Sequence, residues 1–303
     1  MARIDRLMKV KKVTPVFFHG SGGSIDRGGG SVRDQMAAWP DSAKRAYKAT
    51  IQGEMVERTF SSPEIAMSRF FQILDSAASK GSVYQDSKEL NEFADRVGSH
   101  YRDTIASERF LKMVERATPY RYLSALKIGS RPSKRGGSLS VPALRAIPWV
   151  LCWTQTRVLF QTWWGVGTAW KNSSSSERKK LKAVFETNPL FRTYLQALGF
   201  TLAKVEMPIW DFYLAQSGIE PSERKYFSDL FHDEFEATFK FFREITGEKN
   251  PLWFRPWLGE SIELRAAMIH PLNLLEIIAQ EKKDLELLRL SVTGIATGML
   301  TTG

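Results

Sequence analysis

Residues 13–30 read V-T-P-V-F-F-H-G-S-G-G-S-I-D-R-G-G-G, and this stretch indicates both a fold and a ligand. A β-branched and aromatic run leads into a loop with six glycines, one histidine and one arginine. A strand that ends in glycine usually brings its backbone close to a ligand or needs a positive φ. Bare amides and the guanidinium of Arg27 both suit phosphate or carboxylate, so the loop predicts an anion site. Its spacing fits neither a P-loop nor a dinucleotide fingerprint, and a flexible surface loop is the alternative.

Composition bounds the class of protein. The chain has 303 residues, of which 43% are hydrophobic and 12% aromatic, as in a globular protein with a sizeable core. Its formal net charge is +10, but its lysines and arginines form only short clusters, at 9–12, 131–135 and 178–182. No zinc-finger or RNP-type pattern accompanies them. We therefore expect small anionic ligands and no nucleic acid.

The sequence gives no signal for export or membrane insertion. Residues 1–12 are a basic leader whose composition is compatible with disorder, and they lack the apolar core of a signal peptide. The apolar region 141–170 is divided by Arg145 and Arg157, so its uncharged runs fall short of the roughly 20 residues of a spanning helix. The one cysteine, Cys152, excludes an internal disulfide and is expected to be a small buried hydrophobic residue. These features favour a cytoplasmic protein with no membrane partner.

Hydrophobic patterning predicts a mixed α/β architecture. Four short apolar segments are candidate strands: residues 13–18, 125–129, 146–152 and 201–205. Each ends near a charged or glycine-rich segment, which is where an α/β barrel places its chemistry. Apolar residues at three-and-four spacing predict helices over residues 63–76, 88–98, 103–116, 221–246 and 272–289, and composition predicts loops at 129–142 and 173–176. Four strands would make half of an eight-stranded barrel.

Several motifs resemble those of one enzyme family, in that family's order. The glycine loop is similar to F-H-G-R-G-G-x-x-x-R-G-G of phosphoenolpyruvate carboxylases. The other matches are Q-G-E at 52–54, I-G-S-R-P-S-K-R at 128–135, L-R-A-I-P-W-V-L-C-W-T-Q-T-R at 144–157 and G-I-A-T-G-M-L-T-T-G at 294–303. The chain resembles only the C-terminal portion of these longer proteins. The resemblance implies a helix-rich TIM-like α/β barrel, of which residues 1–303 form a single C-terminal portion with the later strands and their surrounding helices.

The resemblance also implies an activity, the carboxylation of phosphoenolpyruvate with bicarbonate to oxaloacetate and phosphate. This anaplerotic carbon fixation feeds the tricarboxylic acid cycle. Every intermediate except carbon dioxide is anionic, which suits fixed arginines. By resemblance the catalytic arginines are Arg27, Arg145 and Arg157. The loop glycines that would approach the anion are Gly20, Gly22, Gly23, Gly28 and Gly29. Lys204 and Arg265 match residues that bind aspartate or malate as feedback inhibitors.

The residues around Arg145 and Arg157 give independent support for an anion site. Both arginines lie in an apolar stretch that includes Trp149 and Trp153, where a guanidinium is costly to bury unless an anion awaits it. A snorkelling side chain or an internal salt bridge is the alternative. The lone His19, beside an aromatic run, is expected to be structural.

Parts of the family pattern are absent from the sequence. The T-A-H-P-T-E segment with the catalytic histidine, the acidic ligands of the expected Mg²⁺ or Mn²⁺, and the S-D-S-x-K-D motif have no counterpart. Ser21 replaces the first loop arginine, Asp26 adds a negative charge beside Arg27, and Leu300 and Thr301 replace the arginine and asparagine of the family's R-N-T-G ending. Residues 40–45 contain a decoy of the lysine motif, in which Asp41 and Lys44 are expected to be ordinary surface residues.

Two functions remain open at this point. In the first, the chain is part of a working carboxylase and requires an N-terminal half, or assembles as a homo-oligomer as the family commonly does. In the second, it is a catalytically inactive relic or an anion-binding module derived from the family. In both cases we expect the chain alone to lack carboxylase activity.

Overall fold

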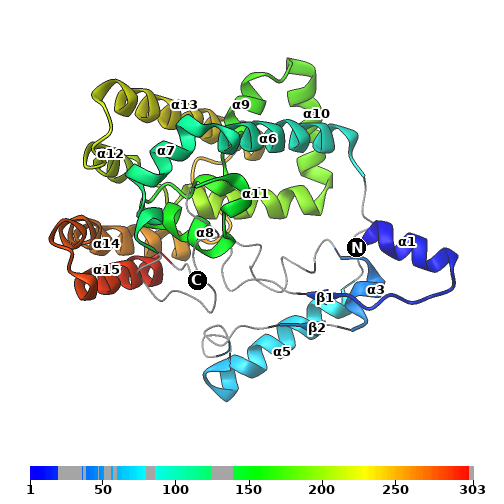
Figure 1. Ribbon diagram of the computed structural model, residues 1–303. Helices are drawn as coiled ribbons and strands as arrows, with labels where there is room; N and C mark the ends of the chain where they lie inside the picture. The colour runs from blue at the N-terminus through cyan, green and yellow to red at the C-terminus, as the bar shows by residue number, and fades with distance from the viewer. Residues whose placement is uncertain are drawn as a thin grey trace. The chain divides into compact units, whose positions relative to one another are not determined.

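The computed structural model describes residues 1–19, 36, 39–46, 48–50, 56, 60–79, 86–123 and 139–299, with only the backbone of Ala2, His19 and Arg121. These residues form two compact units (Figure 1). Unit 1 comprises Met1–Lys88 and Ala183–Ala197, and unit 2 comprises Glu89–Lys182 and Leu198–Gly303. Both predicted arginines of the L-R-A-I-P-W motif lie in unit 2.

Unit 1 contains short elements and one longer helix. Its helices are α1 (Ala2–Val10), α3 (Asp41–Lys44) and α5 (Pro63–Ala78). Its two strands, β1 (Phe18–His19) and β2 (Lys48–Ala49), pair in parallel, with Phe18 opposite Lys48 and His19 opposite Ala49. A small cluster of buried Met36, Trp39 and Ala43 forms a core for this unit.

Unit 2 is helical throughout the part that the structure describes. Its elements are α6 (Lys88–Ala106), α7 (Glu108–Ala117), η2 (Pro119–Arg121), η4 (Val141–Ala143), α8 (Ala146–Gln155), η5 (Phe160–Thr162), α9 (Val166–Lys171), α12 (Met207–Ala215), α13 (Pro221–Thr246), α14 (Pro256–Lys282) and α15 (Leu285–Gly298). The helices α10 (Ser175–Thr187) and α11 (Pro189–Leu202) contribute residues to both units.

Side-chain caps mark the starts of several helices. The hydroxyl of Ser62 accepts from the amide of Ile65 at the start of α5, and Pro63 occupies the first helical position. Ser107 and Asp284 cap α7 and α15 in the same way. Serine and aspartate are favoured here because their oxygens satisfy amides that have no partner in the first turn. The caps fix where α5, α7 and α15 begin, and those at Ser107 and Asp284 lie at breaks inside regions that the sequence predicted as single helices.

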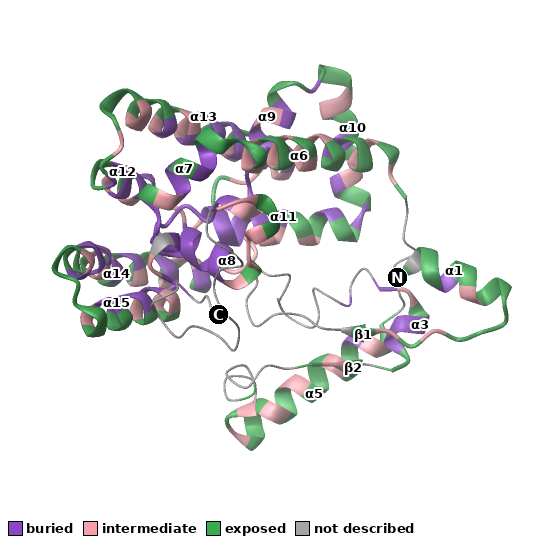
Figure 2. Cartoon of the chain, in the orientation of Figure 1, coloured by how far each residue is buried: buried purple, intermediate pink, exposed green. Residues whose placement is uncertain are grey.

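An aromatic cluster forms the core of unit 2. The ring of Phe231, on α13, lies 4.7 Å from the rings of both Trp164 and Trp210, measured between centroids, and also packs on Trp153 and Phe160. Such tilted and stacked pairs add to the free energy of burying large rings. Figure 2 shows the consequence, since α8 is almost entirely buried.

The contact between α9 and α13 is close and polar. Glu234 on α13 is 4% exposed, and its carboxylate accepts from the amides of Gly165 and Thr168 at 3.0 and 2.9 Å and from the Thr168 hydroxyl at 2.6 Å. It therefore satisfies the first amides of α9. At Gly167, a Cβ atom would meet the Glu234 carbonyl oxygen at 2.6 Å, so the approach of the two helices requires glycine there.

Two of the predicted strands are wrong. Residues 146–152 belong to α8, and 201–205 cover the end of α11 and the turn that follows. Both segments are short, and runs of five to seven mostly apolar residues have no periodicity that separates a strand from a helix. Of residues 13–18 only Phe18 is in a strand, and 125–129 lie outside the described residues. The barrel therefore stays a prediction.

Helix predictions fare better than strand predictions. Those over 63–76 and 221–246 match α5 and α13 closely, 88–98 lies in α6, and α6 and α7 divide the predicted 103–116 at Ser107. The predicted helix 272–289 is two helices, α14 and α15. Of the predicted loop 173–176, Ser175 and Ser176 already belong to α10, and the basic leader contains α1.

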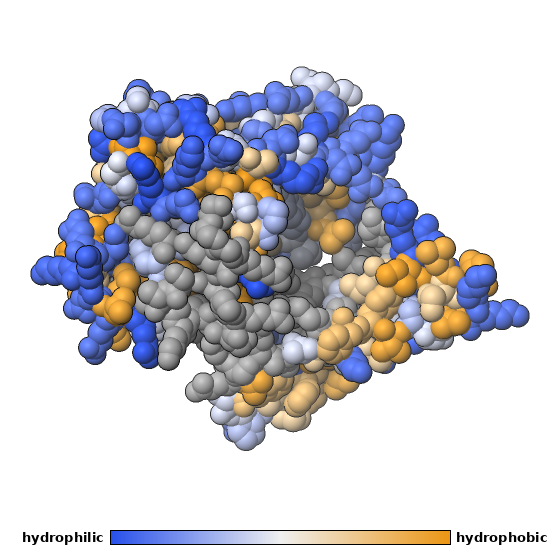
Figure 3. Space-filling model, in the orientation of Figure 1, coloured by the Kyte–Doolittle hydropathy of each residue, from blue (hydrophilic) through white to orange (hydrophobic). Residues whose placement is uncertain are grey.

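The surfaces of unit 1 carry apolar side chains. Along α5 these are the exposed side chains of Ile65, Met67, Phe70, Phe71 and Leu74, and they belong to the hydrophobic surface of that unit in Figure 3. Lys44 corrects another prediction: it is buried, and its Nζ donates to the carbonyl of Ser79 at 3.1 Å.

Among the described residues, no helix combines the length and apolar character that crossing a membrane requires.

Candidate functional site

The C-terminal end of α8 places one predicted catalytic residue in a strained backbone conformation. Arg157 has φ 60°, and its amide donates to the Thr154 carbonyl while the amide of Val158 donates to that of Trp153, both at 3.1 Å. This pair of bonds is the Schellman motif, in which glycine usually occupies the left-handed position. A residue with a Cβ costs about 1–2 kcal/mol there. Strain of this size at a non-glycine residue points to a role for its side chain.

The side chain of Arg157 is fully enclosed yet lacks hydrogen bonds. It is 0% exposed, and none of its three guanidinium nitrogens has a hydrogen-bond partner in the described part of the chain. Its ion pair is long, with 3.7 Å between Nη2 and Oε1 of Glu206. Burial lowers the pKa of Arg157, and the Glu206 carboxylate opposes this effect. The five N–H donors of its guanidinium thus have no acceptor among the described residues.

A buried polar network holds this end of α8 against α14 and α15. The Asn273 amide donates to the Gln155 carbonyl at 2.7 Å and to the Tyr213 hydroxyl at 3.1 Å, and the Gln155 amide donates to the Val292 carbonyl at 3.0 Å. The last turn of α8 is therefore fixed from two neighbouring helices, and Arg157 follows directly from that rigid turn.

A buried acid lies within the same network. Glu276, on α14, accepts from the hydroxyls of Tyr122 and Tyr213, the latter at 2.9 Å. Burial raises the pKa of Glu276 to about 7, against the lowering effect of these two hydrogen bonds. Burial and the negative charge of Glu276 together raise the pKa of Tyr213 well above its ordinary value, whereas Arg157 acts to lower it. Arg157 and Glu276, which carry opposite charges, thus shift the pKa of Tyr213 in opposite directions.

The structure brings Lys204 to the same region as Arg157. The amide of Glu206 donates to the Arg157 carbonyl at 2.9 Å, so the segment that carries Lys204 runs beside the end of α8. Lys204 is 0% exposed, and its Nζ lies 4.2 Å from the centroid of the Phe200 ring. Arg265 lies on α14, where its Nε donates to the hydroxyl of Ser261 at 3.1 Å. Lys204 therefore lies two residues from Glu206, the residue whose amide bonds to Arg157.

Arg145 lies at the opposite end of α8. It is the residue that precedes the first helical position, and it is half-buried with its Nε enclosed and without a hydrogen-bond partner in the described structure. A helix of 10 residues is about 15 Å long. The backbone therefore does not bring Arg145 and Arg157 together, and a site shared by both would need their side chains to span that length.

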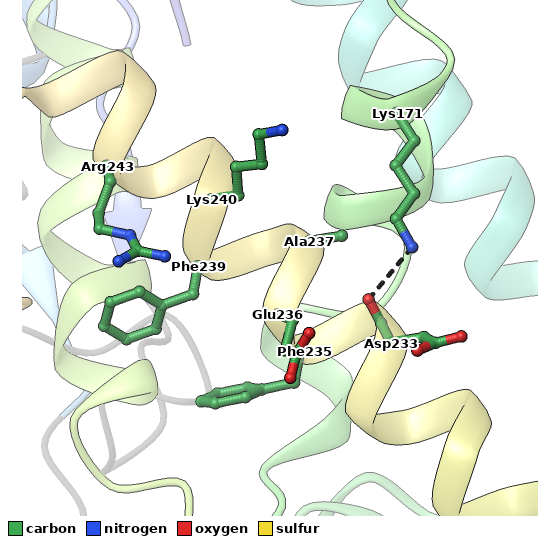
Figure 4. Close-up of a pocket in the computed structure, with 8 residues that line it drawn as sticks. All are labelled: Lys171, Asp233, Phe235, Glu236, Ala237, Phe239, Lys240 and Arg243. Atoms are coloured by element: carbon green, nitrogen blue, oxygen red, sulfur yellow. Dashed lines mark hydrogen bonds between the residues drawn. The ribbon is translucent and has the colours of Figure 1, made fainter.

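A separate groove lies along α13, and its lining differs from the Arg157 region. It has a volume of about 500 Å³ and is lined by Lys171, Asp233, Phe235, Glu236, Ala237, Phe239, Lys240 and Arg243 (Figure 4). Lys171 Nζ donates to the Asp233 carbonyl at 3.3 Å. The charged side chains of both signs are exposed, and the groove contains none of the sequence-predicted residues. It is a solvated surface feature.

The comparisons with known proteins cover nearly the whole chain. The family model described as phosphoenolpyruvate carboxylase matches residues 2–303. The chain belongs to the phosphoenolpyruvate carboxylase family. It is 33% identical to a phosphoenolpyruvate carboxylase of Thermosynechococcus vestitus, 34% to one of Synechocystis and 32% to phosphoenolpyruvate carboxylase 4 of Arabidopsis thaliana. Each match covers 94% of this chain but only 32%, 31% and 29% of the relative, respectively, so the chain spans about a third of their length.

Much of the family's anion loop lies outside the described residues. This holds for Arg27, for the loop glycines Gly20, Gly22, Gly23, Gly28 and Gly29, and for Ser21, Asp26, Leu300 and Thr301. Roles for these residues stay predictions. Cys152 is described, and it is buried with its Sγ 3.1 Å from the Trp149 carbonyl, as expected for a small apolar side chain.

The metal expected for a phosphoenolpyruvate carboxylase finds no ligand set here. The described residues bring together no group of three or more His, Cys, Asp or Glu side chains suited to a metal ion. Glu276 is already bonded by two tyrosine hydroxyls, and Glu206 is paired with Arg157. No chemical step through a metal is therefore assigned to this part of the chain.

Sequence reasoning missed the residues that surround Arg157. Glu206 is separated from the predicted Lys204 by one residue, and this proximity is a signal for it in the sequence. Glu276 is the one acid in P-L-N-L-L-E-I-I-A, where the apolar neighbours indicate burial. His270, 3.8 Å from Glu206, and Tyr213, bonded to Glu276, carry no comparable signal, since these contacts depend on how α14 packs on its neighbours.

Proposed function

We propose that this chain supplies the anion-binding residues of a phosphoenolpyruvate carboxylase, and that Arg157 holds an oxyanion of the substrate or intermediate. One observation carries the proposal: the Arg157 guanidinium is 0% exposed, sits on a strained backbone and has no hydrogen bond in the described structure. A buried cation with unsatisfied donors is costly unless a ligand completes it. The family of the chain makes the ligand a phosphate or a carboxylate.

The proposed reaction explains why such a donor is useful. An oxygen of bicarbonate attacks the phosphorus of phosphoenolpyruvate, and the bond between phosphorus and the enol oxygen breaks to give carboxyphosphate and the enolate. Carboxyphosphate releases carbon dioxide and phosphate, and the enolate carbon then forms a bond to carbon dioxide. Charge moves between oxygens that a planar, permanently charged fork can hold with two parallel hydrogen bonds. Arg157 would bind and orient such oxygens before and after the transfer.

The complete enzyme would need more than this chain. Since the chain spans about a third of its relatives, we infer that activity requires the remaining family portion, as a separate N-terminal half or within an oligomer. The same proposal includes the α/β barrel, the Mg²⁺ or Mn²⁺ ion and the cytoplasmic location. It also includes inhibition by aspartate or malate through Lys204 and Arg265. Lys204 supports it by lying beside the Arg157 segment.

A second candidate is a non-catalytic anion-binding protein. The sequence favours it at one point, the replacement of a loop arginine by Ser21. A coupled assay with phosphoenolpyruvate, bicarbonate and Mg²⁺ or Mn²⁺, which follows oxaloacetate through NADH oxidation, separates the candidates when it is run with and without the missing family portion. Turnover that appears only with that portion supports the carboxylase, and anion binding without turnover in either case supports the second candidate.

Phosphate binding tests the part of the proposal that both candidates share. Isothermal titration of the 303-residue chain with inorganic phosphate should give a saturable signal that Arg157→Gln abolishes. Arg243→Gln is the matched control, because it removes the same charge from the exposed groove on α13 and should leave binding unchanged. Equal binding by the parent and Arg157→Gln, or loss of binding in the control variant, would contradict a site at Arg157.

A further inference from the structure

The Glu206 carboxylate lies between the Arg157 guanidinium and the His270 imidazole without a hydrogen bond to either. Oε1 lies 3.7 Å from Nη2 of Arg157 and 3.8 Å from Nε2 of His270. Both separations exceed hydrogen-bonding distance, which for N–H···O⁻ contacts is about 2.7–2.9 Å. Among the described residues no other side chain donates to this carboxylate. The contact with the Arg157 guanidinium is therefore electrostatic, with no directional bond to break.

The three side chains differ in their access to solvent. Arg157 is 0% exposed, whereas the side chains of Glu206 and His270 are 31% and 40% exposed. The enclosed guanidinium is thus neutralised by an acid that itself reaches solvent. Glu206 and His270 are the members of this group that an incoming solute meets first.

The backbone of Glu206 is fixed, so that only its side chain is free to reorient. Its amide donates to the Arg157 carbonyl, and its own carbonyl accepts from the amides of Ile209 and Trp210 in the first turn of α12. Glu206 precedes α12 at the capping position, but its side chain makes no capping hydrogen bond. The carboxylate therefore serves neither the helix nor a hydrogen-bond network.

We propose that Glu206 is a built-in counter-anion that occupies the ligand position of Arg157 and is displaced toward His270 when a phosphoryl group binds. This rests on the proposed function, since it requires that Arg157 binds anions. The carboxylate lowers the affinity of the site, and it does so unequally. A monoanion gains little by exchanging places with a carboxylate, whereas a dianionic phosphoryl group gains more attraction to the guanidinium. Glu206 thus acts as a selectivity residue that favours phosphoryl groups over monocarboxylates.

The other charged and titratable groups around the site are consistent with this role. Lys204 is separated from Glu206 by one residue and lies over the Phe200 ring. Tyr213 and Glu276 are buried and bond to each other, and the charge of Arg157 acts on Tyr213. On α14, Arg265 bonds to Ser261. Glu206 is the acid that forms an ion pair with Arg157.

Removing the carboxylate tests the proposal, because the expected effect is a gain. In titrations with inorganic phosphate, Glu206→Gln should bind about tenfold more tightly than the parent, within the range of ordinary coupling energies. Acetate binding, weak in the parent, should become measurable in this variant. His270→Gln should weaken phosphate binding, since the displaced carboxylate loses its alternative partner. Glu220→Gln is the matched control: Glu220 occupies the same capping position before α13, also without a capping bond, and its substitution should change neither affinity.

A double variant separates this inference from the proposed function. Glu206→Gln should bring no gain when Arg157→Gln is already present. If Arg157→Gln alone abolishes phosphate binding but Glu206→Gln leaves or lowers the affinity, the counter-anion role is wrong and the Arg157 site stands. If Arg157→Gln binds phosphate like the parent, the proposed function itself fails. An equal gain in Glu220→Gln would reduce the effect to net charge and would also overturn the inference.

Discussion

Two buried charges in unit 2 have opposite surroundings. Glu234, where α13 meets α9, is 4% exposed, and its carboxylate accepts hydrogen bonds from two amides and a hydroxyl. Arg157, at the end of α8, is 0% exposed, and its guanidinium has no hydrogen bond among the described residues. The described residues satisfy the hydrogen-bonding groups of the first charge and not those of the second. A completed charge stabilises the fold, whereas an incomplete one is explained by a ligand.

The backbone repeats this contrast. The close approach of α9 to α13 uses glycine at Gly167, where a Cβ atom would clash, so sequence and geometry agree. At the end of α8 an arginine occupies the left-handed position that favours glycine. The backbone preference for glycine is thus followed near Glu234 and violated at Arg157. Violations of such local preferences occur chiefly at functional sites.

The largest expected effect comes from removing the completed charge. Glu234→Ala leaves two amides and a hydroxyl without their acceptor, and it should lower the free energy of unfolding by about 3 kcal/mol. Urea denaturation followed by circular dichroism measures this. Glu236→Ala, an exposed acid on the same helix, serves as the control and should change stability by less than about 0.5 kcal/mol. Equal losses in the two variants would remove the distinction between completed and exposed charges.

Glu276 sharpens the comparison through pH, because it is a buried acid that two tyrosines complete. Burial raises its pKa from 4.5 to about 7, so the folded state binds a proton that the unfolded state releases. Its contribution to stability is full below about pH 4.5 and is lost as the pH rises through about 7, on the order of 2–3 kcal/mol. Urea midpoints at several pH values should show this decline in the parent.

The matching variants test the origin of that decline. Glu276→Gln should remove this part of the pH dependence, since its amide does not titrate. Glu281→Gln, an exposed position on the same helix, should keep the parent's profile. A decline that survives in Glu276→Gln would assign the pH dependence to another group.

The smallest expected effect is an increase in stability. Arg157→Gly relieves the left-handed strain and removes an uncompleted buried cation, so it should raise the free energy of unfolding by about 1 kcal/mol while phosphate binding disappears. Arg157→Ala removes the cation but keeps the strain, and it should be less stable than the glycine variant. A loss of stability in Arg157→Gly would mean that the guanidinium stabilises the fold, and the contrast with Glu234 would fail.

The sequence predicted the burial of Arg157 better than it predicted the secondary structure around this residue. The motif and its apolar neighbours point to Arg157, which the structure buries and pairs with Glu206, while its role in binding stays a prediction. The segment before it, 146–152, reads as a strand in the sequence but is helical, because an evenly apolar run carries no period. Helices with polar faces and caps, such as α5 and α13, were found because their spacing is visible. The barrel prediction depended on the strands, so it gains nothing from the described part of the chain.

Long-range polar contacts were beyond reach of the sequence. Glu206 meets Arg157 across 49 positions in the chain, and Asn273 meets Gln155 across 118. Such pairs depend on how α8, α12 and α14 pack, and one sequence holds no local signal for that. Lys44 shows the same limit in the other direction, because a residue expected at the surface is buried against Ser79.

A crystal structure of the 303-residue chain with inorganic phosphate tests the central claim most directly. The account predicts phosphate oxygens about 2.7–2.9 Å from the guanidinium nitrogens of Arg157, with the Glu206 carboxylate turned toward His270. Phosphate bound only in the groove on α13, or an Arg157 guanidinium that hydrogen-bonds to protein groups with no phosphate beside it, would contradict the account.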